Sequence, residues 1–172
     1  MPLLLRLRLC KLVNAPSPTH CIFTLNCSDS LNLTICGIAK HWLLQQKQVH
    51  IVTTAMNHNS VLRPLHAIAS EGVTHTIVEA DSKTGLVSPE DIANAITKDT
   101  KLVAIVHGSN VTGTVQDIRA IKDVCVEIPL LVDAAQTMGH TDIDVRRDGI
   151  DLLAFPGHKG LLGPLGTGGL II

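Results

Sequence analysis

Short apolar runs alternate along the chain with segments whose apolar residues follow helical spacing. Seven runs predict β-strands, at residues 21–25, 49–54, 73–79, 102–107, 129–133, 151–155 and 168–172. These runs are short and nearly continuous in apolar residues, which is typical of strands that are covered on both faces of a sheet.

Four segments between these runs predict helices, at residues 31–42, 61–69, 88–96 and 118–125. The third opens with Ser88-Pro-Glu-Asp91, where serine can cap a helix, proline suits its first turn and the acids complement the helix dipole. Strands that alternate with helices imply right-handed crossovers and a mainly parallel sheet with helices on both faces. The predicted fold class is therefore α/β.

The two ends of the chain differ from the middle. Residues 1–18 carry a weak pattern, so we expect the patterned domain to cover residues 19–172. The final run reaches the last residue with no helix after it to cover the strand. We therefore expect a part of a larger fold, truncated at both ends.

The composition of the chain excludes several classes of protein. A chain of 172 residues with 45% hydrophobic and 17% charged residues suits one folded domain, and excludes disorder. A net charge of -1 and 2% aromatic residues give no sign of nucleic-acid or membrane-surface binding. No apolar stretch has the length of a membrane span, and Arg6 and Arg8 interrupt the only leader-like stretch. Five cysteines without a C-x-x-C pair predict reduced thiols and a cytoplasmic protein.

Polar residues follow five of the predicted strands. The five stretches are Asn26-Cys-Ser-Asp29, Asn57-His-Asn-Ser60, His107-Gly-Ser-Asn110, Asp133-Ala-Ala-Gln136 and Pro156-Gly-His-Lys159. The carboxyl ends of parallel strands meet at one edge of the sheet, where ligands of such folds bind. We therefore expect a small-molecule site at this edge.

Four of these side chains have two interpretations each. Lys159 is either a surface lysine or, among its neighbouring glycines, a partly desolvated amine able to form a Schiff base. Asp133 either caps the following segment or holds a cationic ring nitrogen. His58 either caps a helix or stacks on a flat ligand. Ser28 is either an ordinary N-cap or part of an anion site at a helix N-terminus.

Two other site types fit less well. The glycine-rich stretch at residues 157–169 has neither the Walker nor the dinucleotide spacing. A metal hydrolase could use His107, Asp133, His140 or His158, but no H-x-H or H-x-x-x-H spacing occurs among them.

Five ordered stretches resemble one enzyme family. They are residues 23–32, His58-Asn-Ser-Val-Leu-Arg-Pro64, Ser109-Asn-Val-Thr-Gly-Thr-Val-Gln116, residues 132–140 and Gly157-His-Lys-Gly160. Over residues 18–172 the chain resembles the large domain of class V pyridoxal-phosphate (PLP) enzymes of fold type I, the cysteine desulfurase and aminotransferase group.

The resemblance implies three catalytic residues. Lys159 would carry PLP as a Schiff base and then move protons at the α-carbon of the substrate. Asp133 would pair with the pyridinium nitrogen and keep it protonated, so that the ring accepts electrons. His58 would stack on the face of the ring.

The resemblance also implies further cofactor contacts. Gln136 would hydrogen-bond the phenolic oxygen of PLP, and Asn110 would lie near that oxygen and the substrate. Cys27 and Ser28, together with His158, would hold the phosphate. Asn26-Cys-Ser28 stands where many members have Gly-Ala-Thr, Pro156 where many have a hydroxyl residue, and Asn57 where an acid is common.

The resemblance therefore implies a PLP-dependent enzyme that acts on an amino acid, by cysteine desulfurase-type chemistry, as a homodimer. Members of the family are longer, with a small domain that supplies an arginine for the substrate carboxylate. The alternative is a non-catalytic fragment or pseudoenzyme that retains the PLP-binding fold. The surface left by a missing domain also predicts poor solubility.

Overall fold

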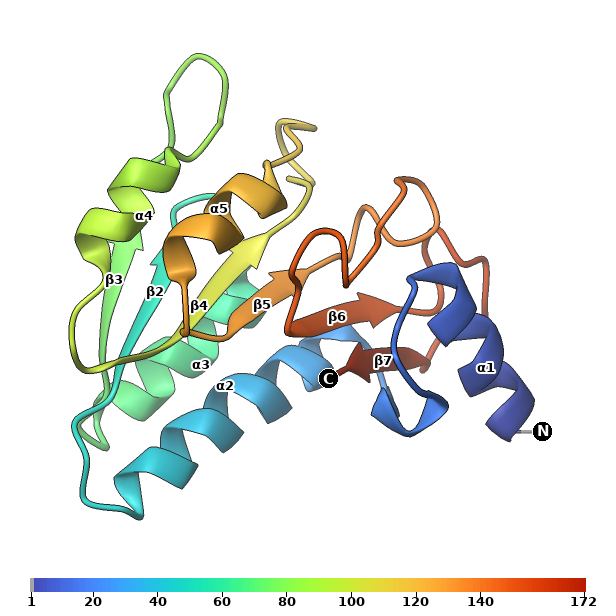
Figure 1. The fold of residues 1–172 in the computed structure, drawn as a ribbon, viewed down its shortest axis with the longest axis horizontal. Helices are drawn as coiled ribbons and strands as arrows, with labels where there is room; N and C mark the ends of the chain where they lie inside the picture. The colour runs from blue at the N-terminus through green and yellow to red at the C-terminus, as the bar shows by residue number, and fades with distance from the viewer. Residues whose placement is uncertain (1) are drawn as a thin grey trace.

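One seven-stranded sheet with helices on both faces organises the chain (Figure 1). The computed structural model describes residues 2–172, so that Met1 of the segment 1–18 lies outside it. The strands are β1 (Cys21–Thr24), β2 (His50–Thr54), β3 (Thr74–Val78), β4 (Thr100–Val106), β5 (Leu130–Asp133), β6 (Leu152–Pro156) and β7 (Gly168–Ile171). Each lies within two residues of its predicted range, which confirms the α/β prediction.

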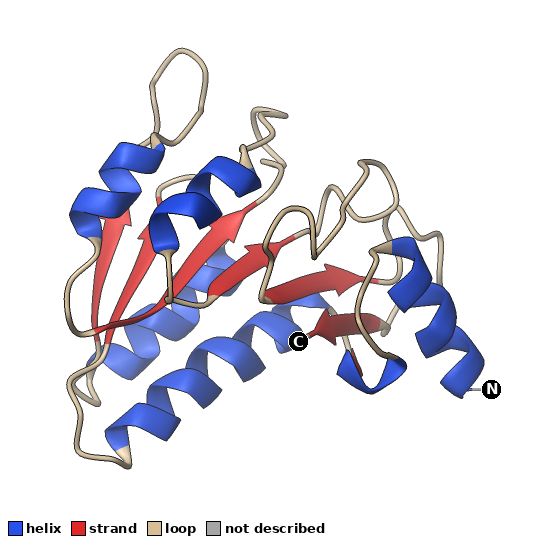
Figure 2. Cartoon of the chain, viewed as in Figure 1, coloured by secondary structure: helices blue, strands red, loops and turns tan. Residues whose placement is uncertain are grey.

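The helices occupy the four predicted segments and one further segment (Figure 2). They are α1 (Pro2–Leu12), α2 (Cys27–Leu43), α3 (Asn59–Ala69), α4 (Pro89–Ala95) and α5 (Ile118–Cys125), with a short 3-10 turn at Pro18–His20. Ser88 caps α4 through the backbone N–H of Asp91, as predicted. The sequence pattern did not predict α1, which contributes Leu9 and Cys10 to the core. The domain boundary at residues 18 and 19 stays a prediction.

The strand order places five strand ends at one edge of the sheet. The order is β1-β7-β6-β5-β4-β2-β3, and the pairs from β6 across to β3 are parallel. β7 is antiparallel to both β6 and β1, so β1 points in the same direction as β6. The carboxyl ends of β1, β2, β4, β5 and β6 therefore meet at one edge, as the predicted site requires.

Both faces of the sheet are buried. In β4, Leu102 and Ala104 face the core beneath α2 and α3, while Val103 and Ile105 face the core beneath α1, α4 and α5. Successive side chains of a strand alternate between the faces, so a central strand needs apolar residues at every position. This explains why the strands appear in the sequence as continuous apolar runs.

Asn57, after β2, joins that strand to β4. Its Nδ2 donates to the carbonyl of Ala104 at 2.7 Å and to the hydroxyl of Thr53, and its Oδ1 accepts from the backbone N–H of Val106. The side chain is 6% exposed, so these bonds replace water for two buried backbone groups.

An apolar groove opens between α1, β1 and the loop before β7. Its volume is about 760 Å³, and its lining includes Leu4, Leu5, Phe23, Phe155 and Leu161. Beside it, Leu165 is 82% exposed. Within residues 2–172, no helix has both the length and the apolar character needed to cross a membrane.

Candidate functional site

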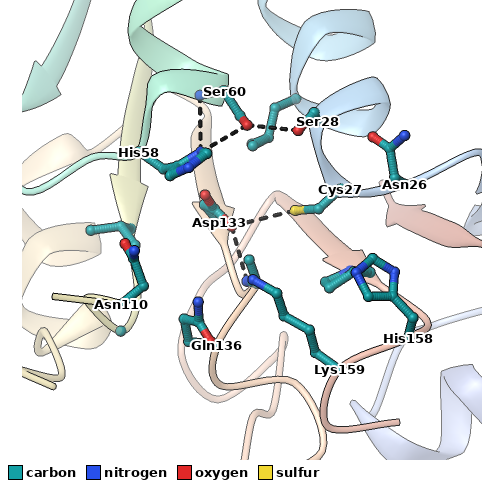
Figure 3. A pocket seen from close by; sticks show the side chains of 15 residues that line it. Asn26, Cys27, Ser28, His58, Ser60, Asn110, Asp133, Gln136, His158 and Lys159 are labelled. Carbon is teal, nitrogen blue, oxygen red and sulfur yellow. Dashed lines mark hydrogen bonds between the residues drawn. The ribbon is translucent and has the colours of Figure 1, made fainter. Parts of the chain in front are cut away.

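A cavity of about 170 Å³ lies at the carboxyl edge of the sheet (Figure 3). Its lining includes all eight residues that the sequence singled out, which come from five separate strand ends. They are Cys27, Ser28, His58, Asn110, Asp133, Gln136, His158 and Lys159. Because residues 27 to 159 are far apart in sequence, the sheet order brings them together.

Asp133 ends β5 at the bottom of this cavity. It is 2% exposed, and its Oδ1 accepts from the backbone N–H of Ala135 at 2.9 Å and from the thiol of Cys27 at 3.4 Å. Burial raises the pKa of Asp133, while the N–H of Ala135, the thiol and the nearby His58 and Lys159 oppose that shift. The capping interpretation is confirmed by the Ala135 contact. A buried carboxylate beside a cavity also favours a cationic ligand group.

Lys159 follows β6 and extends its amine toward Asp133 (Figure 3). The residue as a whole is exposed, as the surface-lysine interpretation expects, and it also lines the cavity. The glycines that flank His158 and Lys159 allow tight packing. A side chain on Gly157 would overlap Thr167, and one on Gly160 would overlap the carbonyl of Met138.

His58 begins α3 and caps it. Its Nδ1 accepts from the backbone N–H of Ser60 at 3.1 Å, so the capping interpretation is correct, and a neutral ring carries its proton on Nε2. The hydroxyl of Ser60 lies 2.9 Å from the same Nδ1 and 2.6 Å from the hydroxyl of Ser28. Ser60 thus connects the ends of α2 and α3 across the cavity (Figure 3).

Ser60 was not among the predicted site residues. The signal was present, since Ser60 belongs to the same polar stretch after β2 as His58. Ser28 is not an N-cap, because Asn26 caps α2 by accepting from the N–H of Asp29 at 2.9 Å. The N-cap interpretation of Ser28 is therefore wrong, and its hydroxyl faces Ser60 in the cavity.

The donor set fits PLP. The Nδ1 of His158 is buried and has no hydrogen-bond partner within residues 2–172, and it lies in the same cavity as the hydroxyl of Ser28. Together they offer polar contacts for a phosphate. Asp133 suits a cationic ring nitrogen, Gln136 suits a phenolic oxygen, and the amine of Lys159 suits an aldehyde.

A metal centre has no support in the part of the chain that the structure describes. Within residues 2–172, no three His, Cys, Asp or Glu side chains come together as ligands for a metal ion. His107, Asp133, His140 and His158, the residues of the metal-hydrolase alternative, thus form no such group.

A mixed sheet with helices on both faces, and a lysine near a buried aspartate at its carboxyl edge, is the architecture of part of the large domain of fold type I PLP enzymes. The family model described as aminotransferase class-V matches residues 5–172. The chain belongs to the aminotransferase class-V family.

Relatives in this family are cysteine desulfurases by name. A probable cysteine desulfurase of Methanothermobacter thermautotrophicus is 40% identical over 158 residues, which cover 91% of this chain and 38% of that protein. The cysteine desulfurase IscS of Clostridium botulinum (strain Hall) is 39% identical over 98% of this chain and 42% of its own length. The chain thus spans about two fifths of the length of the curated relatives it matches.

Solved structures have the same fold. A structure described as SspA in complex with cysteine is 34% identical, with a TM-score of 0.92 over 99% of this chain and 48% of that chain. The apo structure of a cysteine desulfurase from Thermococcus onnurineus NA1 is also 34% identical, with a TM-score of 0.87 over 97% of this chain and 41% of that chain.

Proposed function

We propose that residues 19–172 form the PLP-binding domain of an enzyme that acts on an amino acid by cysteine desulfurase-type chemistry. The observation that carries the proposal is the cavity in which Lys159 faces the buried Asp133. The names of the relatives support cysteine as the substrate. The proposal includes a homodimer, which light scattering of the purified chain would test.

Each residue of the cavity has a defined task in this proposal. PLP, when bound, supplies an electron sink for a negative charge at the substrate α-carbon. Asp133 would hold a proton on the ring nitrogen, because a buried carboxylate stabilises a cation beside it. Lys159 would attach the cofactor through its amine and move a proton at the α-carbon. His58 would stack on the ring while its Nδ1 accepts from the backbone N–H of Ser60.

The remaining residues orient the ligand. Ser28 and His158 would donate hydrogen bonds to the phosphate, and the N-terminal end of α2 would add free backbone N–H groups. Gln136 and Asn110 also line the cavity and would contact the phenolic oxygen of PLP. Such contacts would hold the cofactor in one orientation.

Two observations favour a second candidate, a non-catalytic PLP-binding domain. Among residues 2–172, no arginine lines the cavity to pair with a substrate carboxylate. In the same part of the chain, four cysteines are buried and Cys36 is half-buried, so no exposed thiol is ready to accept sulfur.

Absorbance spectroscopy with added PLP tests whether the chain binds the cofactor through Lys159. The wild-type chain is expected to show a visible band that borohydride removes, with the cofactor then found on the peptide containing Lys159. Lys159→Ala should lack the band, and Lys83→Ala, which changes an exposed lysine outside the cavity, should keep it. An equal band in Lys159→Ala would refute the site.

Release of sulfide or alanine from cysteine then distinguishes the enzyme from the non-catalytic domain. Turnover by the PLP-loaded chain supports the desulfurase. PLP bound to Lys159 without turnover supports the second candidate.

A further inference from the structure

The thiol of Cys27 points toward Asp133 in the cavity (Figure 3). Its Sγ lies 3.4 Å from Oδ1 of Asp133, and the neighbouring Ser28 points its hydroxyl toward Ser60 instead. Cys27 is 7% exposed and Asp133 is 2% exposed, so water does not compete for this contact. The side chains of these two adjacent residues therefore have different partners.

Both bonds to the carboxylate of Asp133 end on the same oxygen. The thiol of Cys27 and the N–H of Ala135 donate to Oδ1, and within residues 2–172 no hydrogen bond reaches Oδ2. Two donors on one oxygen restrict rotation of the carboxylate about its last bond. The second oxygen is left for a ligand in the cavity.

We propose that Cys27 is a positioning residue for Asp133, whose carboxylate it holds so that Oδ2 is free to pair with a cationic nitrogen of the ligand. One of the two tests below uses PLP as the ligand, and there the inference rests on the proposed function, because the cationic nitrogen is the ring nitrogen of PLP. In this proposal the side chains of Ser28 and His158 contact the phosphate, and the side chain of Cys27 does not.

The charges around Cys27 keep its proton in place. Burial and the adjacent Asp133 raise the pKa of the thiol, and Lys159 alone opposes them among the groups that act on it. A thiol that stays protonated can donate to a carboxylate, whereas a thiolate would repel it. The arrangement thus depends on the negative charge of Asp133.

Alkylation of the chain without cofactor tests this dependence. Iodoacetamide labelling across pH 7–10 is read for each cysteine by peptide mass spectrometry, in the wild type and in Asp133→Asn. Removal of the charge should lower the pKa of Cys27, and should raise its labelling rate near neutral pH about tenfold. Cys125 is the internal control, because burial raises its pKa to about 11 and it lies on α5, outside the cavity.

The ratio of labelling at Cys27 to labelling at Cys125 gives the result. A rise in this ratio in Asp133→Asn supports the proposal, and an unchanged ratio in a folded variant overturns it. Unfolding would increase labelling of both thiols, and in that case the second test decides. Since no PLP is present, this result is independent of the proposed function.

The second test compares Cys27→Ala with Cys27→Ser by equilibrium binding of PLP, followed by fluorescence quenching. Cys27→Ala should weaken binding about fivefold, and Cys27→Ser, which keeps a donor, should recover to within about twofold of the wild type. Equal affinities for wild type and Cys27→Ala, or equal losses in both variants, would overturn the positioning role. Failure of the wild type to bind PLP would instead refute the proposed function.

Discussion

The buried side chain of Asn57 stabilises the fold through hydrogen bonds to the backbone of β4. Its side chain satisfies the carbonyl of Ala104 and the N–H of Val106, both buried in β4. Asn57→Ala leaves the N–H of Val106 without this partner, while the carbonyl of Ala104 still accepts from the hydroxyl of Thr53, and we expect the free energy of unfolding to fall by about 1–3 kcal/mol. Urea denaturation followed by circular dichroism measures the loss.

Asn59→Ala is the matched control for this prediction. Asn59 is exposed at the start of α3, two residues from Asn57, and its replacement should change stability by less than about 0.5 kcal/mol. Equal effects of the two substitutions would contradict the role given to the Asn57 bonds.

The location of the site residues could be predicted from the sequence, but their contacts could not. His58, Asp133 and Lys159 each follow an apolar run, and parallel strands bring such positions together. The direction of the Cys27 thiol depends on the rotation of α2 relative to β5, which no pattern within either segment encodes. The bridging role of Ser60 was missed for the same reason, since it depends on how α2 and α3 pack.

A glycine in α2 and a glycine in β7 differ in the space around them, so replacing each with alanine should change stability in opposite directions. In α2, a side chain on Gly37 would meet no atom within 4 Å, so Gly37→Ala should stabilise the chain by about 0.5–1 kcal/mol. At the start of β7, a side chain on Gly168 would come within 2.6 Å of the Cα of Asn26. Gly168→Ala should destabilise it by about 1–3 kcal/mol.

Thermal denaturation of both variants beside the wild type measures these changes. Gly168→Ala should also displace Asn26 from the start of α2, so its affinity for PLP should fall along with its melting temperature. A melting temperature for Gly168→Ala equal to that of Gly37→Ala would contradict the close contact between β7 and α2.

Two elements show where the sequence pattern stops being informative. Leucines surround α1 on most sides, and five of its residues are exposed large hydrophobics, so no apolar stripe marks it as a helix. The antiparallel direction of β7 is also hidden, because a buried strand has the same continuous apolar run in either direction. Its pairing is decided by partners far away in the sequence.

The molecule as a whole has an apolar surface that predicts self-association. Leu4 and Leu5 are 54% and 49% exposed along the groove beside α1. Large exposed apolar patches drive association. Beside the proposed homodimer, we expect sedimentation velocity to show larger species, and the double variant Leu4→Glu/Leu5→Glu to reduce them.

Leu44→Glu is the control, because Leu44 is 86% exposed at the end of α2, outside the groove. It should leave the sedimentation profile unchanged. A wild-type chain that sediments as a single small species would contradict the prediction.

The pairing of β1 with β7 has a consequence for synthesis on the ribosome. Within residues 2–172, β1 is the first strand and pairs only with β7, the last strand, some 150 residues later. Contacts between such distant segments form slowly, because a long loop must close first. β2, β3, β4 and β5 can assemble while the nascent chain is still growing. The end of β1, and with it the start of α2 in the cavity, is completed only after residue 171 has left the exit tunnel.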